Sequence, residues 1–509
     1  MSDLVGSLGG LRFAGIAILV LCASSLTQRL LYNLYWHPLA HIPGPRLAAA
    51  TYLYQTYFGL AGGKSRYYMH IAELHRRYGP VVRITPDEVH LSDPENHEII
   101  HCVGSKYAKA TPYYSALGAG YSTFTAGPNE VHKPRRARLD PFFSRRNVIK
   151  MEYLVQSRAA KLLHIMSSKF AAGAAVDLHH AFRSISVDVI SDYAFGESYS
   201  LLDREDLGRE FFELTGGIGP TWWVFQQWPA VQAFALSLPL PVAKAMSKPL
   251  KQVLTLLEQA LSQVLEVKAK LDAGQKVDKP CIFEALLEPA DGYQIPTPDQ
   301  IKDEAYAILN AASDTTGNAM TVTAYNVLSN PELYRTLTEE LRTAFPNKDE
   351  TLEFSKLEKL PYLTGAIKEG LRLSFGVPGR MPRVVPESGA KFNGYYLPAG
   401  SFVSLSSWML HQDESYFPNP RKFDPTRWFD PKDVRRMEKA FVPFGKGTRA
   451  CAGINLAYCE LYVTLGTLFR HFDNLEPNHL TEEDLTYDDY FSAQIPLNAA
   501  KLHVHLDKH

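Results

Sequence analysis

A glycine-rich segment near the C-terminus reads Phe444-Gly445-Lys446-Gly447-Thr448-Arg449-Ala450-Cys451-Ala452-Gly453 and leads into an apolar helical pattern. Glycines at 445 and 447 allow a tight turn whose backbone N–H groups approach the sulfur. Such hydrogen bonds, together with burial, set the electron donation of a thiolate that ligates a metal. We therefore predict that Cys451 is the sulfur ligand of a haem iron. The alternative is a structural cysteine in a glycine-rich loop.

Three neighbours of Cys451 fit the same hypothesis. Phe444 would pack beside the macrocycle and keep water from the sulfur. Arg449 could form a charge-assisted hydrogen bond with a haem propionate. Gly453 would let the following helix lie close to the porphyrin plane. With these positions filled as they are, the segment resembles the haem-binding loop of the cytochrome P450 family.

Composition limits the class of protein. The chain has 509 residues, 46% of them apolar, and a formal net charge of −1, which gives no indication of a nucleic-acid partner. The cysteines are few, odd in number and scattered: Cys22, Cys102, Cys281, Cys451 and Cys459. This is no disulfide framework, and it suits a reducing compartment. Cys459 lacks the close cysteine pairs or histidines of a zinc site, so we interpret it as a core residue.

The pattern of elements predicts one helix-rich domain. Helical periodicity dominates from Asn147 to Thr343, while residues 81–84 and 88–91 read as a hairpin, and strand-like pieces return at 383–385 and 400–405. We expect a mainly α fold with small β sheets (α+β). The motifs run in the family's order from about Trp36 to the C-terminus, so the resemblance implies the cytochrome P450 fold. No G-x-G-x-x-G run follows a strand, so no fused flavin or nicotinamide domain is expected.

An apolar segment at the N-terminus predicts a transmembrane anchor over residues 4–28. Residues 29–45 then form a proline-rich connector, and residues 46–509 the haem-thiolate catalytic domain. The rival interpretation is a cleavable secretory signal with its cleavage region near Ser24. The anchor and connector resemble membrane-bound family members of filamentous fungi. That resemblance implies a single-pass protein of the endoplasmic reticulum membrane with a cytosolic catalytic domain.

A long helix is predicted to open near Asp299 and to carry a second motif. Small and apolar residues at helical spacing define a stripe that places Thr315 on the buried face, directly after Asp314. A threonine in mid-helix can donate to the carbonyl four residues back, that of Ala311. Alone, the motif could be a helix cap or hinge. Beside the cysteine turn, Asp314 and Thr315 resemble the family's acid–threonine pair for oxygen activation, with Ala312 where the family commonly has glycine.

A third motif concerns the fold. Glu369 and Arg372 lie three residues apart on a helix predicted from about Tyr362 to Phe375, and Arg427 follows in a proline-fixed segment. An isolated pair at this spacing is usually a solvated face. The three residues together resemble the family's Glu–Arg–Arg lock. The resemblance implies a role in fold and haem retention.

The same resemblance assigns anchors for the propionates of haem b. His132 and Arg136, four apart, match the family's aromatic–basic pair, with histidine where many members have tryptophan. Arg383 matches the propionate arginine that follows the Glu–Arg helix. Lys133, Arg135, Arg138 and Lys446 remain as a basic patch that could attract an acidic electron donor or be a solvated face.

The activity implied is that of a haem-thiolate monooxygenase. It would use dioxygen and electrons from NADPH, delivered by a separate NADPH–cytochrome reductase. The substrate would be a bulky, lipophilic molecule, because aromatic residues fill the segments that resemble the family's recognition regions. The fungal resemblance favours a terpenoid or polyketide intermediate of secondary metabolism. Two alternatives stay open: a haem-thiolate isomerase or dehydratase that needs no reductase, and a non-catalytic haem-binding protein.

Overall fold

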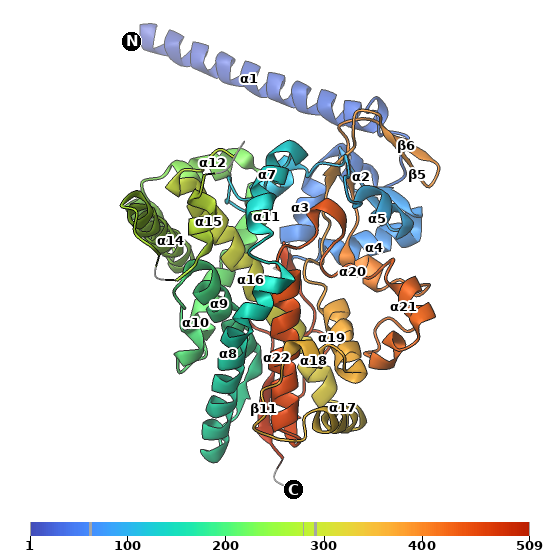
Figure 1. Cartoon of the computed structure of the whole chain (residues 1–509). Coiled ribbons are helices and arrows are strands. Elements are labelled where there is room, and N and C mark those ends of the chain that lie inside the picture. Colours follow the sequence, from blue (N-terminus) through green and yellow to red (C-terminus); the bar gives the residue numbers. More distant parts are fainter. Residues whose placement is uncertain (1, 61–63, 278, 290–292, 508–509) are drawn as a thin grey trace.

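The computed structural model describes residues 2–60, 64–277, 279–289 and 293–507. These residues form a helix-rich body with four small sheets, from which one long N-terminal helix projects (Figure 1). The predicted fold class, mainly α with small β sheets, is confirmed. The N-terminus and the C-terminus lie at opposite ends of the molecule.

The helices before residue 230 are α1 (Ser2–Tyr35), α2 (Arg46–Ala50), α3 (Leu53–Leu60), α4 (Tyr67–Tyr78), α5 (Glu95–Ile100), α6 (Thr111–Ser115), α7 (Asn129–Leu139), α8 (Arg145–Ala171), α9 (Leu178–Phe195), α10 (Arg209–Gly216), α11 (Gly219–Gln227) and α12 (Pro229–Ser237). Those that follow are α13 (Leu240–Met246), α14 (Lys248–Asp272), α15 (Ile282–Leu287), α16 (Pro298–Leu328), α17 (Pro331–Ala344), α18 (Phe354–Leu357), α19 (Pro361–Ser374), α20 (Ser407–His411), α21 (Pro431–Met437) and α22 (Ile454–His471). Short 3-10 turns lie at Leu201–Asp203, Pro425–Trp428 and Gly447–Arg449.

The largest sheet joins segments from both halves of the chain. Its order is β1 (Val81–Arg83), β2 (Glu88–Leu91), β7 (Phe402–Ser404) and β4 (Arg383–Val384). The predicted hairpin is correct, with Val81 opposite Leu91 in antiparallel register. β7 then pairs parallel to β2, and β4 pairs antiparallel to β7. Both later strand-like pieces were therefore predicted correctly. Their partner strands were not predicted from the sequence.

Three further sheets are smaller. One orders β3 (Val176–Asp177), β11 (His503–Leu506) and β8 (Leu475–Pro477). Two are hairpins: β5 (Ala390–Phe392) with β6 (Tyr395–Leu397), and β9 (Asp488–Tyr490) with β10 (Ser492–Gln494). The β9–β10 hairpin packs against α16.

Helix α16 is the centre of the helical core and packs against α9, α14, α19 and α22. Its N-terminus is set by a capping box, in which the Thr297 hydroxyl accepts from the N–H of Gln300 and the Gln300 side chain accepts from the N–H of Thr297. Glycines let the helices approach closely. A Cβ on Gly317 would lie 3.0 Å from Cα of Arg183 on α9, and one on Gly370 of α19 would clash with Thr323.

The predicted stripe on α16 describes its burial only in part. Ile301, Ala305 and Ala319 are buried, whereas Ile308, Ala312 and Thr315 are half-buried. Residues 316–324 are buried on every side. A helix that is surrounded by other helices has no solvent face, so hydrophobic spacing alone could not identify its important side.

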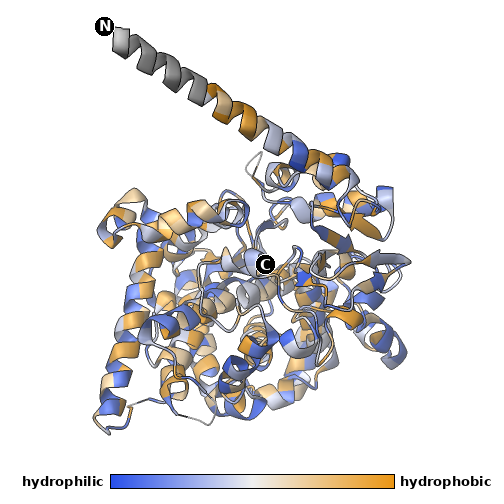
Figure 2. Ribbon diagram, turned by 90° about the horizontal axis from the view of Figure 1, so that it is seen from above, coloured by the Kyte–Doolittle hydropathy of each residue, from blue (hydrophilic) through white to orange (hydrophobic). Residues whose placement is uncertain are grey.

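The N-terminal helix α1 leaves the body without covering it (Figure 2). From Gly15 to Tyr35 it is long and apolar enough to cross a membrane, and Leu19, Val20 and Leu21 are all exposed. It continues beyond Gln28 to Tyr35, so the first residues predicted as connector are helical. The helix ends just before the first proline, Pro38, as the absence of an N–H and the fixed φ of proline require.

The rest of the proline-rich segment packs on the body. Leu39 and Ile42 are buried in the cluster around the largest sheet. Arg83 donates to the carbonyl of Asn33 in the last turns of α1 (2.9 Å), and its own N–H donates to the carbonyl of Pro43 (2.8 Å). The end of α1 is thus held against the sheet by hydrogen bonds.

We expect α1 to keep the whole protein in the membrane. After carbonate extraction of microsomes from an expressing cell, the protein should remain in the pellet, because about 20 apolar residues suffice to span the hydrocarbon core. A variant that lacks residues 2–28 should shift to the soluble fraction. Recovery of the full chain in the supernatant, or a mature N-terminus near Ser24, would contradict the anchor.

Candidate functional site

The turn around Cys451 depends on backbone conformations that only glycine adopts easily. Gly445 and Gly447 have φ of +62° and +68°. A Cβ on Gly447 would lie 2.2 Å from the carbonyl oxygen of His101, so the turn rests directly on the chain at residues 101–102. The N–H of Cys451 donates to the carbonyl of Phe444 across the turn (2.8 Å). The turn thus holds the cysteine at the N-terminus of α22.

Cys451 is exposed, although enough protein atoms lie around its thiol to desolvate it in part. Burial raises its pKa, whereas the N–H of Gly453 and the charge of Arg136 lower it. Cys459, in contrast, is fully buried in the helical core as predicted. Of these two cysteines only Cys451 is exposed to a ligand, and the N–H of Gly453 and the charge of Arg136 offset part of the effect of burial on its thiol.

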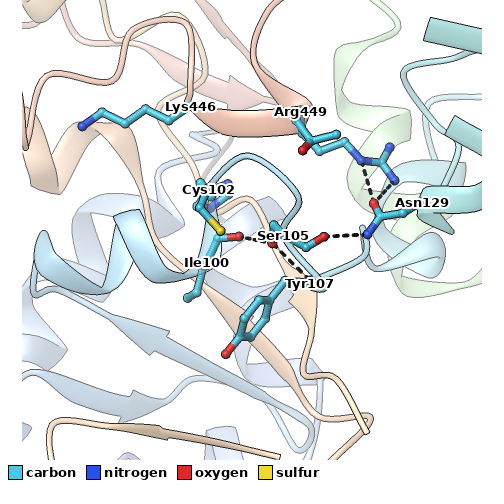
Figure 3. A pocket seen from close by; sticks show the side chains of 9 residues that line it. Ile100, Cys102, Ser105, Tyr107, Asn129, Lys446 and Arg449 are labelled. Carbon is cyan, nitrogen blue, oxygen red and sulfur yellow. Dashed lines mark hydrogen bonds between the residues drawn. The ribbon is translucent and has the colours of Figure 1, made fainter. Parts of the chain in front are cut away.

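Arg449 ties the turn to the loop before α7. Its guanidinium donates to the carbonyls of Ala126 and Gly127 (both 2.7 Å) and to the side chain of Asn129 (2.9 Å). Asn129 in turn donates to the carbonyl of Ser105 (2.9 Å), as Figure 3 shows. The pocket drawn there has a volume of about 10 Å³, which is room for about one water molecule, so it is no substrate site.

Four cations gather near the turn. Arg136 donates to the carbonyl of Ala450 (2.7 Å), and Arg383 donates to the carbonyls of Met381 and Pro382 (both 3.1 Å). The fourth is Lys109, which sequence reasoning missed. Its Nζ donates to the carbonyl of Phe124 (2.6 Å) and lies 3.7 Å from the centre of the Phe124 ring.

Three of these four cations form no ion pair with a carboxylate among the described residues. Burial first, and then Arg383, Arg449 and Arg136, lower the pKa of Lys109 well below its usual value. Burial and Arg383 likewise lower the pKa of Arg449 to about 10. Within the described residues, only Arg136 of the four forms an ion pair, with Asp140. Buried cations require an anion, and a group with two carboxylates, such as haem, fits this requirement.

His132 lies in the same region but has a different character. It is buried, its Nδ1 has no partner in the described structure, and burial with the four cations lowers its pKa to about 3. A neutral imidazole can still donate one hydrogen bond from a ring nitrogen. The structure therefore brings together Arg136, Arg383, Arg449 and His132, the four residues that we expect to contact the propionates.

Phe444, the remaining predicted cofactor contact, is half-buried, with its ring centre 5.2 Å from that of Tyr458 on α22. It packs against the helix that starts after the turn.

The acid–threonine pair lies in the middle of α16. The Thr315 hydroxyl donates to the carbonyl of Ala311 at 2.8 Å, as predicted, and Asn310 and Ala311 are exposed in this otherwise packed helix. Asp314 is buried and forms an ion pair with Arg183 of α9. Its second oxygen accepts from the hydroxyl of Ser492 on β10 (3.3 Å). Sequence reasoning identified neither partner, because each is remote from α16 along the chain.

The three predicted lock residues meet around one carboxylate. Glu369 is fully buried and accepts from Arg372 through both oxygens (2.8 Å each) and from Nε of Arg427 (3.2 Å). The N–H of Asp424 and the indole of Trp428 donate to it as well (2.9 and 3.0 Å). Every lone pair of this buried charge is therefore used.

A histidine connects the lock to the cysteine turn. His411 is buried, and its Nδ1 lies 2.9 Å from the carbonyl of Arg372. Its Nε2 accepts from the N–H of Val442 at 3.0 Å, two residues before Phe444. Burial and the nearby Arg372 lower its pKa to about 3, which keeps the imidazole neutral. Nδ1 therefore carries the proton and donates to the carbonyl of Arg372, while Nε2 accepts from the N–H of Val442. In this one tautomer the ring links the two backbone groups.

The expected basic patch is only partly free. Arg135 donates to the carbonyl of Tyr121, and Arg138 donates to that of Ala285 (2.7 Å). Lys446 pairs with Glu98 (3.3 Å), whereas Lys133 is exposed. Most of these side chains hold elements of the protein together, so they make a weaker docking surface than the sequence suggested.

Comparison with known proteins identifies the family of the chain. Residues 45–501 match the family model "Cytochrome P450". The chain is 34% identical to the cytochrome P450 monooxygenase macH of Penicillium terrestre and to the tryptophan 6-hydroxylase fscE of Fusarium equiseti, with 91% of each chain covered in both cases. It is 32% identical to the conidiogenone synthase PchP450 of Penicillium rubens, covering 87% of this chain and 89% of the relative.

The chain therefore belongs to the cytochrome P450 family, which implies a haem-thiolate cofactor. It is a cytochrome P450 monooxygenase, close to the fungal monooxygenases of secondary metabolism. Enzymes of this family generally receive electrons from a reductase partner.

We expect the lock to matter for stability. Replacing one partner of a fully buried ion pair leaves an uncompensated charge, so Arg372→Ala should lower the free energy of unfolding by about 3–5 kcal/mol. Thermal unfolding should show this as a fall of several degrees in the midpoint. Arg421 is the matched control, because its pair with Glu482 is exposed on both sides (77% and 82%). Arg421→Ala should change stability by about 1 kcal/mol or less. Equal effects of the two variants would contradict a structural lock.

Proposed function

We propose that the chain binds haem b through Cys451 and hydroxylates a bulky lipophilic small molecule, with electrons from NADPH delivered by a separate NADPH–cytochrome reductase. The observation that carries the proposal is the accessible Cys451 thiol in a glycine turn, next to buried cations that lack carboxylate partners. We place the enzyme in the endoplasmic reticulum membrane with its catalytic domain in the cytosol.

The residues of the site divide into a metal ligand, propionate partners, a structural lock and a shield against water. Cys451 supplies the thiolate, and the N–H of Gly453 tempers its charge. Arg136, Arg383, Arg449 and Lys109, with neutral His132, would hold the propionates. Glu369, Arg372 and Arg427 would keep the segment before the turn in place and so retain the haem. Phe444 would exclude water from the sulfur side.

When bound, a thiolate-ligated haem supplies the cleavage of dioxygen, so that one oxygen atom enters the substrate and the other leaves as water. This reaction consumes protons, which the protein must deliver. The Thr315 hydroxyl can both donate and accept, and the Asp314 carboxylate can accept and release a proton. We assign proton delivery to these two side chains.

The nature of the substrate rests on less direct arguments. Rings from three segments pack edge to face: Tyr113, Trp222 and Phe491, with centroids 5.2–6.4 Å apart. An apolar wall of this kind suits an apolar, polycyclic or aromatic molecule. A terpenoid or polyketide intermediate of secondary metabolism meets that description. A tryptophan derivative is the second candidate, because one relative is a tryptophan 6-hydroxylase.

A spectral titration tests the substrate class. Purified protein should give a type I shift with members of a panel of terpenoids, polyketides and tryptophan derivatives, and no shift with fatty acids. A shift with fatty acids alone would contradict the proposed class.

We expect Cys451 to carry the cofactor spectrum. Reduced protein with carbon monoxide should show the absorption band typical of thiolate-ligated haem, and Cys451→Ala should lose both the band and the activity. Cys459→Ala is the control, because its thiol is buried eight residues along the same segment and should leave both unchanged. A thiolate band that persists in Cys451→Ala would contradict the assignment.

We expect Thr315 and Asp314 to act at different points of proton delivery. Thr315→Ala should bind haem normally, since alanine suits a helix, but should release more hydrogen peroxide and less product per NADPH. Asp314→Asn should instead slow NADPH turnover by about 10²-fold or more, the usual contribution of an acid–base group. If Thr315→Ala forms as much product per NADPH as the wild type, this threonine is a packing residue. An isomerase would then explain the site better.

A further inference from the structure

The carboxylate of Asp314 is held from outside its own helix. Arg183 on α9 donates from Nη2 to Oδ1 of Asp314, and the two side chains are equally buried, each 11% exposed. The hydroxyl of Ser313 also donates to Oδ1 (3.3 Å), while Ser492 donates to Oδ2. Within the described residues, Arg183 is the only cation that pairs with this acid.

The packing of α9 against α16 fixes where Arg183 can reach. Gly317 has no room for a Cβ, because the Cα of Arg183 would lie 3.0 Å and its N 3.1 Å away. One turn earlier on α9, His179 lies 3.2 Å from the hydroxyl of Thr321. The two contacts hold α9 against α16 at the ion pair and in the next turns of α16 after Asp314.

The guanidinium itself has little freedom. Its central carbon lies 4.0 Å from the centre of the Phe212 ring on α10, a cation–π distance. Its Nε is buried without a partner in the described structure. A buried ion pair with one unused donor is a poor device for stability, since burying the charge costs about as much as the pair gains. The arrangement is therefore better explained by what it does to Asp314.

We propose that Arg183 is a positioning residue for proton delivery: it fixes the Asp314 carboxylate in one orientation, so that Oδ2 stays with Ser492 on the β10 side. Consecutive residues of a helix point about 100° apart, so Asp314 faces α9 while Thr315 faces elsewhere. Without Arg183 the carboxylate would be free to turn. This inference rests on the role proposed above for Asp314.

The test compares four variants in the full-length holoenzyme with its reductase. Arg183→Gln should lower NADPH turnover by roughly 10- to 100-fold, the cost of a misplaced catalytic group, and should raise the solvent deuterium isotope effect. The spectral affinity for a type I ligand should not change. Arg183→Lys keeps the charge without the planar fork and should recover part of the turnover. Arg183→Gln/Asp314→Asn should be no slower than Asp314→Asn alone, because the two residues act as one unit.

A control ion pair joins α9 to a different helix. Arg158 of α8 forms an ion pair with Asp192 of α9 at similar depth (20% and 11% exposed) but away from α16. Arg158→Gln should leave turnover and the isotope effect unchanged. Thermal unfolding supplies a readout that does not depend on catalysis: Arg183→Gln should lower the midpoint, and adding Asp314→Asn should restore part of the loss, because no charge is then left unpaired.

The outcomes distinguish failure of the role inferred for Arg183 from failure of the role proposed for Asp314. If Asp314→Asn slows turnover but Arg183→Gln stays within about twofold of the wild type, Arg183 does not position the acid. If Asp314→Asn itself has no effect, the role proposed for Asp314 fails, and this inference fails with it. If Arg183→Gln holds no haem, the double variant is decisive: recovered haem content supports the pairing, and continued loss would make Arg183 a residue of the fold alone.

Discussion

The carboxylate of Glu369 is the interaction on which the rest of the site depends. The chain between β7 and α22 contains only short helices and turns, so it cannot hold its own shape through long ladders of hydrogen bonds. Glu369 gathers Arg372, Arg427 and Trp428 around one buried charge. Arg372 and His411 then extend this network to the N–H of Val442, at the entry to the cysteine turn. An unpaired buried charge costs several kcal/mol, so this geometry leaves little freedom.

The second constraint is electrostatic and acts on the other side of the turn. Lys109, Arg383 and Arg449 lie close together and donate to backbone carbonyls and to Asn129, and none of the three forms an ion pair with a carboxylate among the described residues. The cost is visible as lowered pKa values of Lys109 and Arg449. A fold that keeps such a cluster gains from binding an anion there, since the bound group relieves the repulsion. Cofactor binding and stability are therefore coupled through these side chains.

Helix α16 packs against α22, which follows the cysteine turn, and against the β9–β10 hairpin. In its middle, Gly317 permits the close approach of α9, and this approach brings Arg183 into contact with Asp314. The β9–β10 hairpin contributes Ser492 to Asp314 and Phe491 to the aromatic wall. Phe491 has a φ of +77°, which is strained for a residue with a side chain and occurs where surrounding structure determines the conformation. One hairpin therefore contacts both the aromatic cluster and Asp314, to which we assigned a role in proton delivery.

The sequence by itself determined the features that are local in the chain. The glycine turn, the capping box of α16, the hydrogen bond of Thr315 and the β1–β2 hairpin all involve residues within a few positions of one another. Spacing and residue type are sufficient there, because the backbone offers few conformations at each position. The resemblance to the family added the grouping of Glu369 with Arg427, which no local pattern indicates.

Only the tertiary structure decided which distant groups meet. Arg183 and Asp314 are separated by 131 positions. Lys109 lies near Arg383 and Arg449, although it comes from the first quarter of the chain. Helix α1 continues past Gln28, the end of the predicted anchor, to Tyr35, and the next residues pack on the sheet. The burial of α16 followed no stripe because neighbours surround it. These properties depend on how helices pack, and packing is set by the whole set of side chains rather than by any segment of them.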